Sequence, residues 1–89
     1  MKVSDFIAKF LENNNIRFAY GMSGGAIIHL VDSIYHKTSI EIIFGTNEQF
    51  SAFEADGNAR SNNCDIPGVC FSTSGPGATN LLTGIATSY

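Results

Sequence analysis

Short apolar runs alternate with longer segments of helical pattern along the whole chain. The first helical segment is predicted to run from Ser4, its N-cap, to about Asn14. Three apolar runs follow, and each is succeeded by a turn and a helical pattern. The runs, predicted to be strands, are 16–20, 40–44 and 68–73, and the helical patterns after them are 26–36, 48–60 and 78 onward. Strands separated by helices pair in parallel through right-handed crossovers, because a parallel return needs the length that a helix supplies. The sequence therefore predicts an α/β fold, a three-layer parallel sheet with flanking helices.

The chain has 89 residues, which is enough for one small domain. Its last helical segment reaches Tyr89 without a capping glycine. Three parallel strands also leave both sheet edges unpaired, a liability that complete domains cover. We therefore expect residues 1–89 to be the N-terminal portion of a domain, truncated after its third strand–helix unit.

Charge, hydropathy and cysteine spacing exclude several classes of partner. The net charge is −3 without a basic cluster, which argues against nucleic acid. No apolar run reaches the length of a membrane span, and the N-terminus lacks a signal-peptide pattern. Cys64 and Cys70 match neither a metal pair nor a disulfide scaffold, so Cys64 is expected to be a free thiol and Cys70 a small buried hydrophobe. These features predict a cytoplasmic protein with no membrane partner and no metal ligands in this chain.

One acidic side chain is expected where the second strand ends. Thr46 and Gln49 fit a helix capping box, which predicts where the following helix begins. Glu48 then lies in the first helical turn, at the edge where open α/β sheets bind ligands. A glutamate in that position also complements the helix dipole, so its position alone does not assign catalysis.

Two glycine-rich turns accompany this glutamate, Gly21-Met22-Ser23-Gly24-Gly25 and Ser74-Gly75-Pro76-Gly77. Both follow predicted strands, so a parallel sheet brings them to the same edge as Glu48. Glycine lets a ligand approach the backbone, and helix N-termini offer free N–H donors. The pattern predicts one ligand-binding crevice without naming the ligand.

The first turn also satisfies the G-x-S-x-G pattern, which would make Ser23 a hydrolase nucleophile. Only about twenty residues precede the motif, too few for the upstream strands and oxyanion loop of that fold. Neither His29 nor His36 follows a later strand, where the base of a triad belongs. A serine hydrolase is therefore the least favoured alternative, and the P-loop and dinucleotide motifs are absent.

Four motifs, in their order and spacing over essentially the whole chain, resemble one family. They are Tyr20-Gly21-Met22-Ser23-Gly24-Gly25, Asn47-Glu48-Gln49, Ala55-Asp56-Gly57-Asn58-Ala59-Arg60 and Ser74-Gly75-Pro76-Gly77-Ala78-Thr79-Asn80. The family is the pyrimidine-binding (PYR) domain of thiamine-diphosphate enzymes, and the motifs look closest to acetolactate synthase. No single motif is diagnostic, but the set is specific.

The resemblance implies that Glu48 is the catalytic glutamate that hydrogen-bonds N1′ of the cofactor's aminopyrimidine ring. In the family this bond favours the imino tautomer, whose nitrogen deprotonates thiazolium C2 to the reactive ylide, so the chemistry belongs to the cofactor. The other implied cofactor-binding residues line the pyrimidine pocket: Tyr20, Gly21, Met22, Ser23, Gly24, Gln49, Ser74, Gly75, Pro76, Gly77 and Asn80. Among them, Gln49 and Asn80 are expected to be supporting polar contacts.

Further expectations follow from the resemblance. The parent enzyme would decarboxylate a 2-keto acid such as pyruvate and pass the acyl group to a second carbonyl. It would be a homodimer or higher homo-oligomer with the site shared between subunits.

The family's diphosphate and Mg²⁺ ligands, a Gly-Asp-Gly followed later by Asn-Asn, are absent here, so they are expected outside this segment. The 89 residues alone are then expected to lack turnover. A truncated, non-catalytic folding or dimerisation module is the alternative.

Three residues depart from the family pattern. Asn47 stands where the family commonly has His, Ser23 replaces the usual Pro of the turn, and Asn58 replaces a usual Tyr. None of these changes affects Glu48. Activation of the cofactor is therefore the role that the resemblance supports best, and substrate identity the one that it supports least.

Overall fold

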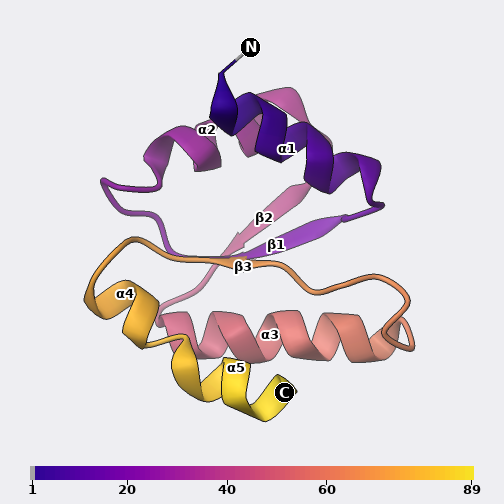
Figure 1. Cartoon of the computed structure of the whole chain (residues 1–89), viewed down its shortest axis with the longest axis vertical. Coiled ribbons are helices and arrows are strands. Elements are labelled where there is room, and N and C mark those ends of the chain that lie inside the picture. Colours follow the sequence, from indigo (N-terminus) through magenta and orange to yellow (C-terminus); the bar gives the residue numbers. More distant parts are fainter. Residues whose placement is uncertain (1) are drawn as a thin grey trace.

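A computed structural model describes residues 2–89 as three layers, with a small sheet between two layers of helices (Figure 1). The elements in chain order are α1 (Val3–Asn13), β1 (Phe18–Gly21), α2 (Ile28–Lys37), β2 (Glu41–Phe44), α3 (Glu48–Ser61), β3 (Cys70–Phe71), α4 (Pro76–Thr79) and α5 (Leu82–Ser88). Helices α1 and α2 cover one face of the sheet, α3 covers the other, and α5 packs on α3. Within residues 2–89, no helix combines the length and apolarity needed to cross a membrane.

The sheet confirms the predicted fold class. Its strands run in the order β2-β1-β3, and both pairings are parallel. Only Cys70 and Phe71 of the predicted third strand pair with β1, so this strand is shorter than expected. Gly21, the last residue of β1, lies opposite Phe44 of β2 and Phe71 of β3. The carboxyl ends of all three strands therefore lie at the same edge.

The main core lies between the sheet and the layer formed by α1 and α2. Its buried members are Ala8, Ile16, Ala19, Ile34, Ile40 and Phe71. Helix α2 faces the core through Ile34, which is buried, while Leu30, Val31 and the preceding Ile27 pack against this cluster. In contrast, Val3, Phe6 and Phe10 of α1 are largely exposed.

The alanine face of α3 allows close approach of neighbouring backbone, as its small side chains suggest. Gly84 of α5 packs directly on Ala52, and Gly68 packs on the carbonyl of Ala55, so a β-carbon at either glycine would clash. Gly57 takes no part in this contact, because a β-carbon there would meet open space. The close packing therefore lies within the chain.

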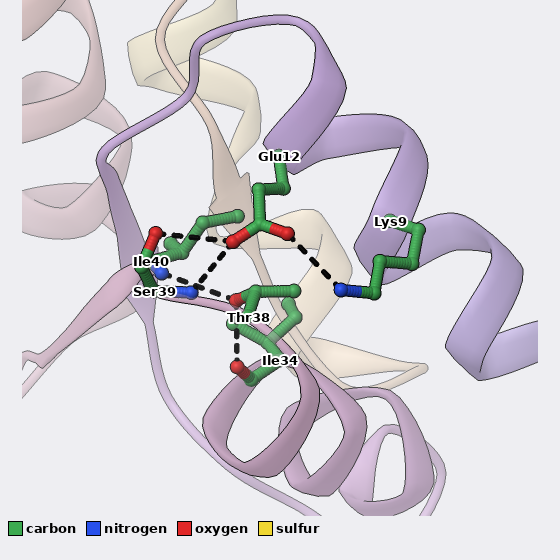
Figure 2. A network of polar contacts seen from close by, with 6 residues as sticks. All are labelled: Lys9, Glu12, Ile34, Thr38, Ser39 and Ile40. Atoms are coloured by element: carbon green, nitrogen blue, oxygen red, sulfur yellow. Dashed lines mark hydrogen bonds and ion pairs between the residues drawn. The ribbon is translucent and has the colours of Figure 1, made fainter.

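A polar network fixes the connection between α2 and β2 (Figure 2). The Glu12 carboxylate of α1 accepts hydrogen bonds from Lys9 Nζ at 3.2 Å, from Ser39 N at 2.8 Å and from Ser39 Oγ at 3.0 Å. These donors, led by the Ser39 backbone N–H, lower the pKa of Glu12. Thr38 Oγ1 donates to Ile34 O and accepts from Ile40 N. The start of β2, and with it the chain that leads to Glu48, is thus anchored to α1.

Two predicted N-caps are wrong, although α3 begins at Glu48 as expected. Helix α3 is capped by Asn47, whose Oδ1 accepts from Gln49 N at 2.8 Å, so Thr46 does not form a capping box. Asn47 directly precedes Glu48, and its side chain reaches the Gln49 N–H. The helix start is therefore capped without a capping box between Thr46 and Gln49. Helix α1 begins at Val3, and Ser4 lies inside it, hydrogen-bonded to the buried Ser33.

The predicted last helix is divided in two. Residues 74–77 were expected to form a turn before a helix from Ala78, but α4 already begins at Pro76. Proline has the backbone angle of a first helical residue, and Gly75 before it adopts a left-handed φ of 71°. Only one turn forms before Asn80 and Leu81 separate α4 from α5. Pro76 and Gly77 are therefore helical residues.

Replacing Asn47 by alanine removes the cap of α3. We expect the Asn47→Ala change to lower the free energy of unfolding by about 0.5–2 kcal/mol. The matched Thr46→Ala change should cost less than about 0.5 kcal/mol, because Thr46 is exposed and caps nothing. Urea unfolding followed by circular dichroism measures both. A larger loss of stability for Thr46→Ala than for Asn47→Ala would support the capping box and contradict the assignment of Asn47 as the cap.

Candidate functional site

Three loops leave the same edge of the sheet, because Gly21, Phe44 and Phe71 are aligned in register. In Figure 1 the segment after β1, the start of α3 and the segment into α4 lie on the same side of the molecule. The predicted convergence of the two glycine-rich segments and Glu48 at one edge is therefore present in the structure.

Glu48 is the first residue of α3, and its side chain is half-buried against α4. Its two carboxylate oxygens have different neighbours. Asn80 Nδ2 donates a hydrogen bond to Oε1 at 3.2 Å. A β-carbon built on Gly77 would lie 3.3 Å from Oε2. The carboxylate thus lies against the turn of α4, where its hydrogen bond to Asn80 remains exposed to solvent.

Thr73, which the sequence did not single out, joins the two glycine segments. A β-carbon on Gly24 would lie 2.6 Å from Thr73 Cβ, and one on Gly77 would lie 3.1 Å from its methyl carbon Cγ2. Both glycines therefore pack on the same side chain. The glycines themselves signalled close approach, but only the tertiary structure shows what approaches them.

Other predicted site residues hold more peripheral positions. Tyr20 is half-buried on β1, and its pKa is raised by burial and by the carboxylates of Glu54 and Glu41. Gly21 is buried against the carbonyl of Phe71. Met22 is half-buried after β1, whereas Ser74, Gly75 and Pro76 are exposed at the start of α4.

Gln49 contributes its backbone rather than its side chain to the observed contacts. Its N–H donates to Asn47 Oδ1, and no side-chain hydrogen bond of Gln49 occurs among residues 2–89. Two residues later, Ser51 is fully buried, and its Oγ lies 2.9 Å from the position of a β-carbon on Gly45. Its Oγ has no hydrogen-bond partner in this described part of the chain, a feature that the sequence did not indicate.

The geometry gives no support to a serine hydrolase. Ser23 is exposed and does not have the left-handed φ of a strained turn, which among non-glycine residues 2–89 occurs at Asn15, Asn63 and Cys64. His36 is paired with Asp32 at 3.3 Å on the surface of α2. No hydrogen bond joins Ser23 to a histidine within the described residues.

Both cysteines line a groove of about 330 Å³ between α3, β3 and α5, which does not include Glu48. Cys64 is an exposed free thiol, and burial raises the pKa of the partly buried Cys70 thiol. Cys64 is the free thiol that the sequence predicts, whereas Cys70 is only partly buried and not the buried hydrophobe that was expected. Residues 2–89 contain no group of three or more His, Cys, Asp or Glu side chains placed to hold a metal ion.

Comparison with known proteins identifies the family. The model of the thiamine pyrophosphate enzyme, N-terminal TPP binding domain, matches residues 1–89, and the chain therefore belongs to this family. The resemblance to thiamine-diphosphate enzymes inferred from the four motifs is confirmed.

Relatives within this family are acetolactate synthases. The chain is 45% identical over 89 residues to a probable acetolactate synthase large subunit of Methanocaldococcus jannaschii, covering 100% of the chain and 15% of that protein. It is 42% identical over 83 residues to acetolactate synthase isozyme 1 large subunit of Escherichia coli, covering 93% and 14%. With chloroplastic acetolactate synthase of Arabidopsis thaliana it shares 36% over 85 residues, covering 96% and 12%. The chain thus spans about one seventh of the length of these relatives.

The contact between Gly24 and Thr73 can be tested by adding one methyl group. We expect Gly24→Ala to lower the free energy of unfolding by about 1–3 kcal/mol, because the new β-carbon overlaps Thr73. Gly25→Ala is the matched control, since its β-carbon would meet nothing within 4 Å. Its effect should stay within about 0.5 kcal/mol. Equal effects of the two changes in urea unfolding would contradict the packing of these loops.

Proposed function

We propose that this chain is the N-terminal part of a thiamine-diphosphate-dependent enzyme of the acetolactate-synthase type. Such an enzyme decarboxylates a 2-keto acid such as pyruvate and joins the resulting acyl group to a second carbonyl compound. The family match and the names of the relatives support the cofactor and the class of reaction. The single observation that carries a role for this chain is the half-buried Glu48 carboxylate at the sheet edge.

The residues at this edge fit one end of the cofactor. Glu48 Oε2 accepts no hydrogen bond from residues 2–89 and therefore offers a site for a ring nitrogen. Next to it, Gly77 lacks a side chain that would fill the adjoining space. A flat heterocycle can approach a carboxylate that is bordered by bare backbone more closely than one surrounded by side chains. Thiamine diphosphate would supply a thiazolium ring that takes up the electron pair left by decarboxylation.

In this proposal Glu48 holds a proton at N1′ of the aminopyrimidine and is the catalytic residue of this chain. The segments 20–24 and 74–77 border the ring, mainly through backbone and small side chains, and Gln49 fixes the start of α3 through its N–H. The half-buried position of Glu48 reduces competition from water for that hydrogen bond.

The remaining parts of the site are assigned to other residues of the enzyme. We place the ligands of Mg²⁺ and of the diphosphate outside this segment. A homodimer or higher homo-oligomer would share the site between subunits. Exposed apolar side chains on α5, Leu82 and Ile85, favour an interface there, and they equally favour the second candidate function, a non-catalytic dimerisation module.

The role of Glu48 is tested by the exchange of the C2 proton of bound thiamine diphosphate with solvent deuterium. In the full-length protein, Glu48→Gln should slow this exchange by at least about 100-fold, because a positioned acid–base group typically contributes that much. Asp65→Asn, which changes an exposed carboxylate in the loop between α3 and β3, should leave the rate within about twofold, because that loop enters the sheet at the opposite edge from Glu48. An unchanged rate in Glu48→Gln would remove Glu48 from the mechanism and favour the dimerisation module.

A further inference from the structure

The hydrogen bond between Asn80 and Glu48 connects two segments that are far apart in the sequence. Asn80 is the residue that ends α4, and its Nδ2 donates to Oε1 of a carboxylate on the first residue of α3. An ionised carboxylate only accepts hydrogen bonds, so the amide nitrogen, not the amide oxygen, must face it. The bond is therefore directional, and it involves only one of the two carboxylate oxygens.

The single turn of α4 presents both of its contacts to Glu48 from the same side. Gly77 and Asn80 are three residues apart, which places them on one face of a helical turn. This turn is closed by Asn80 N donating to Pro76 O at 3.0 Å and by Thr79 N donating to Gly75 O at 3.1 Å. Asn80 thus approaches Oε1 while the bare backbone of Gly77 borders Oε2.

Thr73 supports this arrangement from behind. Its methyl carbon lies 3.1 Å from the position of a β-carbon on Gly77, and Gly77 itself is buried. A side chain at position 77 would therefore crowd Thr73, and only glycine lets the turn of α4 lie this close to the segment after β3. The backbone that carries Asn80 thereby lies close to the start of α3.

We propose that Asn80 is a positioning residue that acts through Glu48 and not by touching the cofactor. By holding Oε1, Asn80 restricts rotation of the carboxylate and keeps Oε2 directed to the space beside Gly77. This inference rests on the proposed function, because it gives Oε2 the task of binding the aminopyrimidine nitrogen. It assigns to Asn80 a different role from that of a direct ligand to the ring.

A double-mutant cycle in the full-length protein separates these roles. The variants are Asn80→Ala, Glu48→Gln and the double mutant, and the readouts are C2 proton exchange and the calorimetric dissociation constant for thiamine diphosphate. We expect Asn80→Ala to slow exchange about tenfold, as the loss of one hydrogen bond to a charged group does. On the Glu48→Gln background, Asn80→Ala should change neither the exchange rate nor the dissociation constant by more than about twofold. The carboxylate that Asn80 orients is already absent from that background.

Conservative variants and a matched asparagine complete the test. Asn80→Gln retains an amide donor and should recover part of the exchange rate, whereas Asn80→Asp retains the shape without the donor and should not. Asn62→Ala is the control, since Asn62 also ends a helix and uses its side chain on Asn58 O, far along α3 from Glu48. It should leave exchange unchanged. Circular dichroism establishes that each variant is folded.

Two results would overturn the role of Asn80 while leaving Glu48 in place. The first is an unchanged exchange rate in Asn80→Ala. The second is a loss in cofactor affinity or exchange that adds fully to that of Glu48→Gln, which would indicate direct contact with the cofactor or a general structural effect. If Glu48→Gln itself exchanges at the normal rate, the proposed function fails, and the role of Asn80 fails with it.

Discussion

Parallel pairing of β1 with both β2 and β3 decides which parts of this chain meet. The pairing aligns Gly21 with Phe44 and Phe71, so the chain leaves the sheet three times at one edge. Glu48, Gly24 and Gly77 are separated along the sequence, yet each lies a few residues beyond one of these strand ends. The site depends on this register, because a shift of one strand would carry its loop away from the other two.

Small residues allow the loops at the aligned strand ends to pack closely together. Gly24 and Gly77 both pack on Thr73, and a side chain at either position would separate the loops. Small residues also allow close packing along α3, where Gly68 and Gly84 lie against its alanines. These contacts hold α3 against α5 and against the segment that enters β3, and the first residue of α3 lies within hydrogen-bonding distance of Asn80.

Much of the fold was predictable because the local signals agreed with one another. The three apolar runs are separated by helical patterns, and the resulting parallel sheet places Glu48 where the sequence predicted. The prediction was weaker where two local signals compete within one or two residues. Thr46 and Asn47 are both good caps, and only the backbone path after β2 selects Asn47. Pro76 was assigned to a turn, although proline also favours the first position of a helix.

The contacts within the site could not be obtained from local pattern. The pairing of Asn80 with Glu48, the support from Thr73 and the buried hydroxyl of Ser51 all depend on tertiary packing. The motifs named the residues that border the site, and the structure adds which of them touch. That distinction separates a residue that binds a ligand from one that orients its neighbour.

The central claim is that the Glu48 carboxylate, held against the turn of α4, receives the pyrimidine ring of thiamine diphosphate. The most direct measurement is an experimental structure of the full-length protein with this cofactor bound. The account predicts one oxygen of Glu48 at hydrogen-bonding distance, about 2.6–3.2 Å, from N1′, with the other oxygen still bonded to Asn80. A carboxylate turned into bulk solvent, with the ring bound away from both glycine segments, would contradict it.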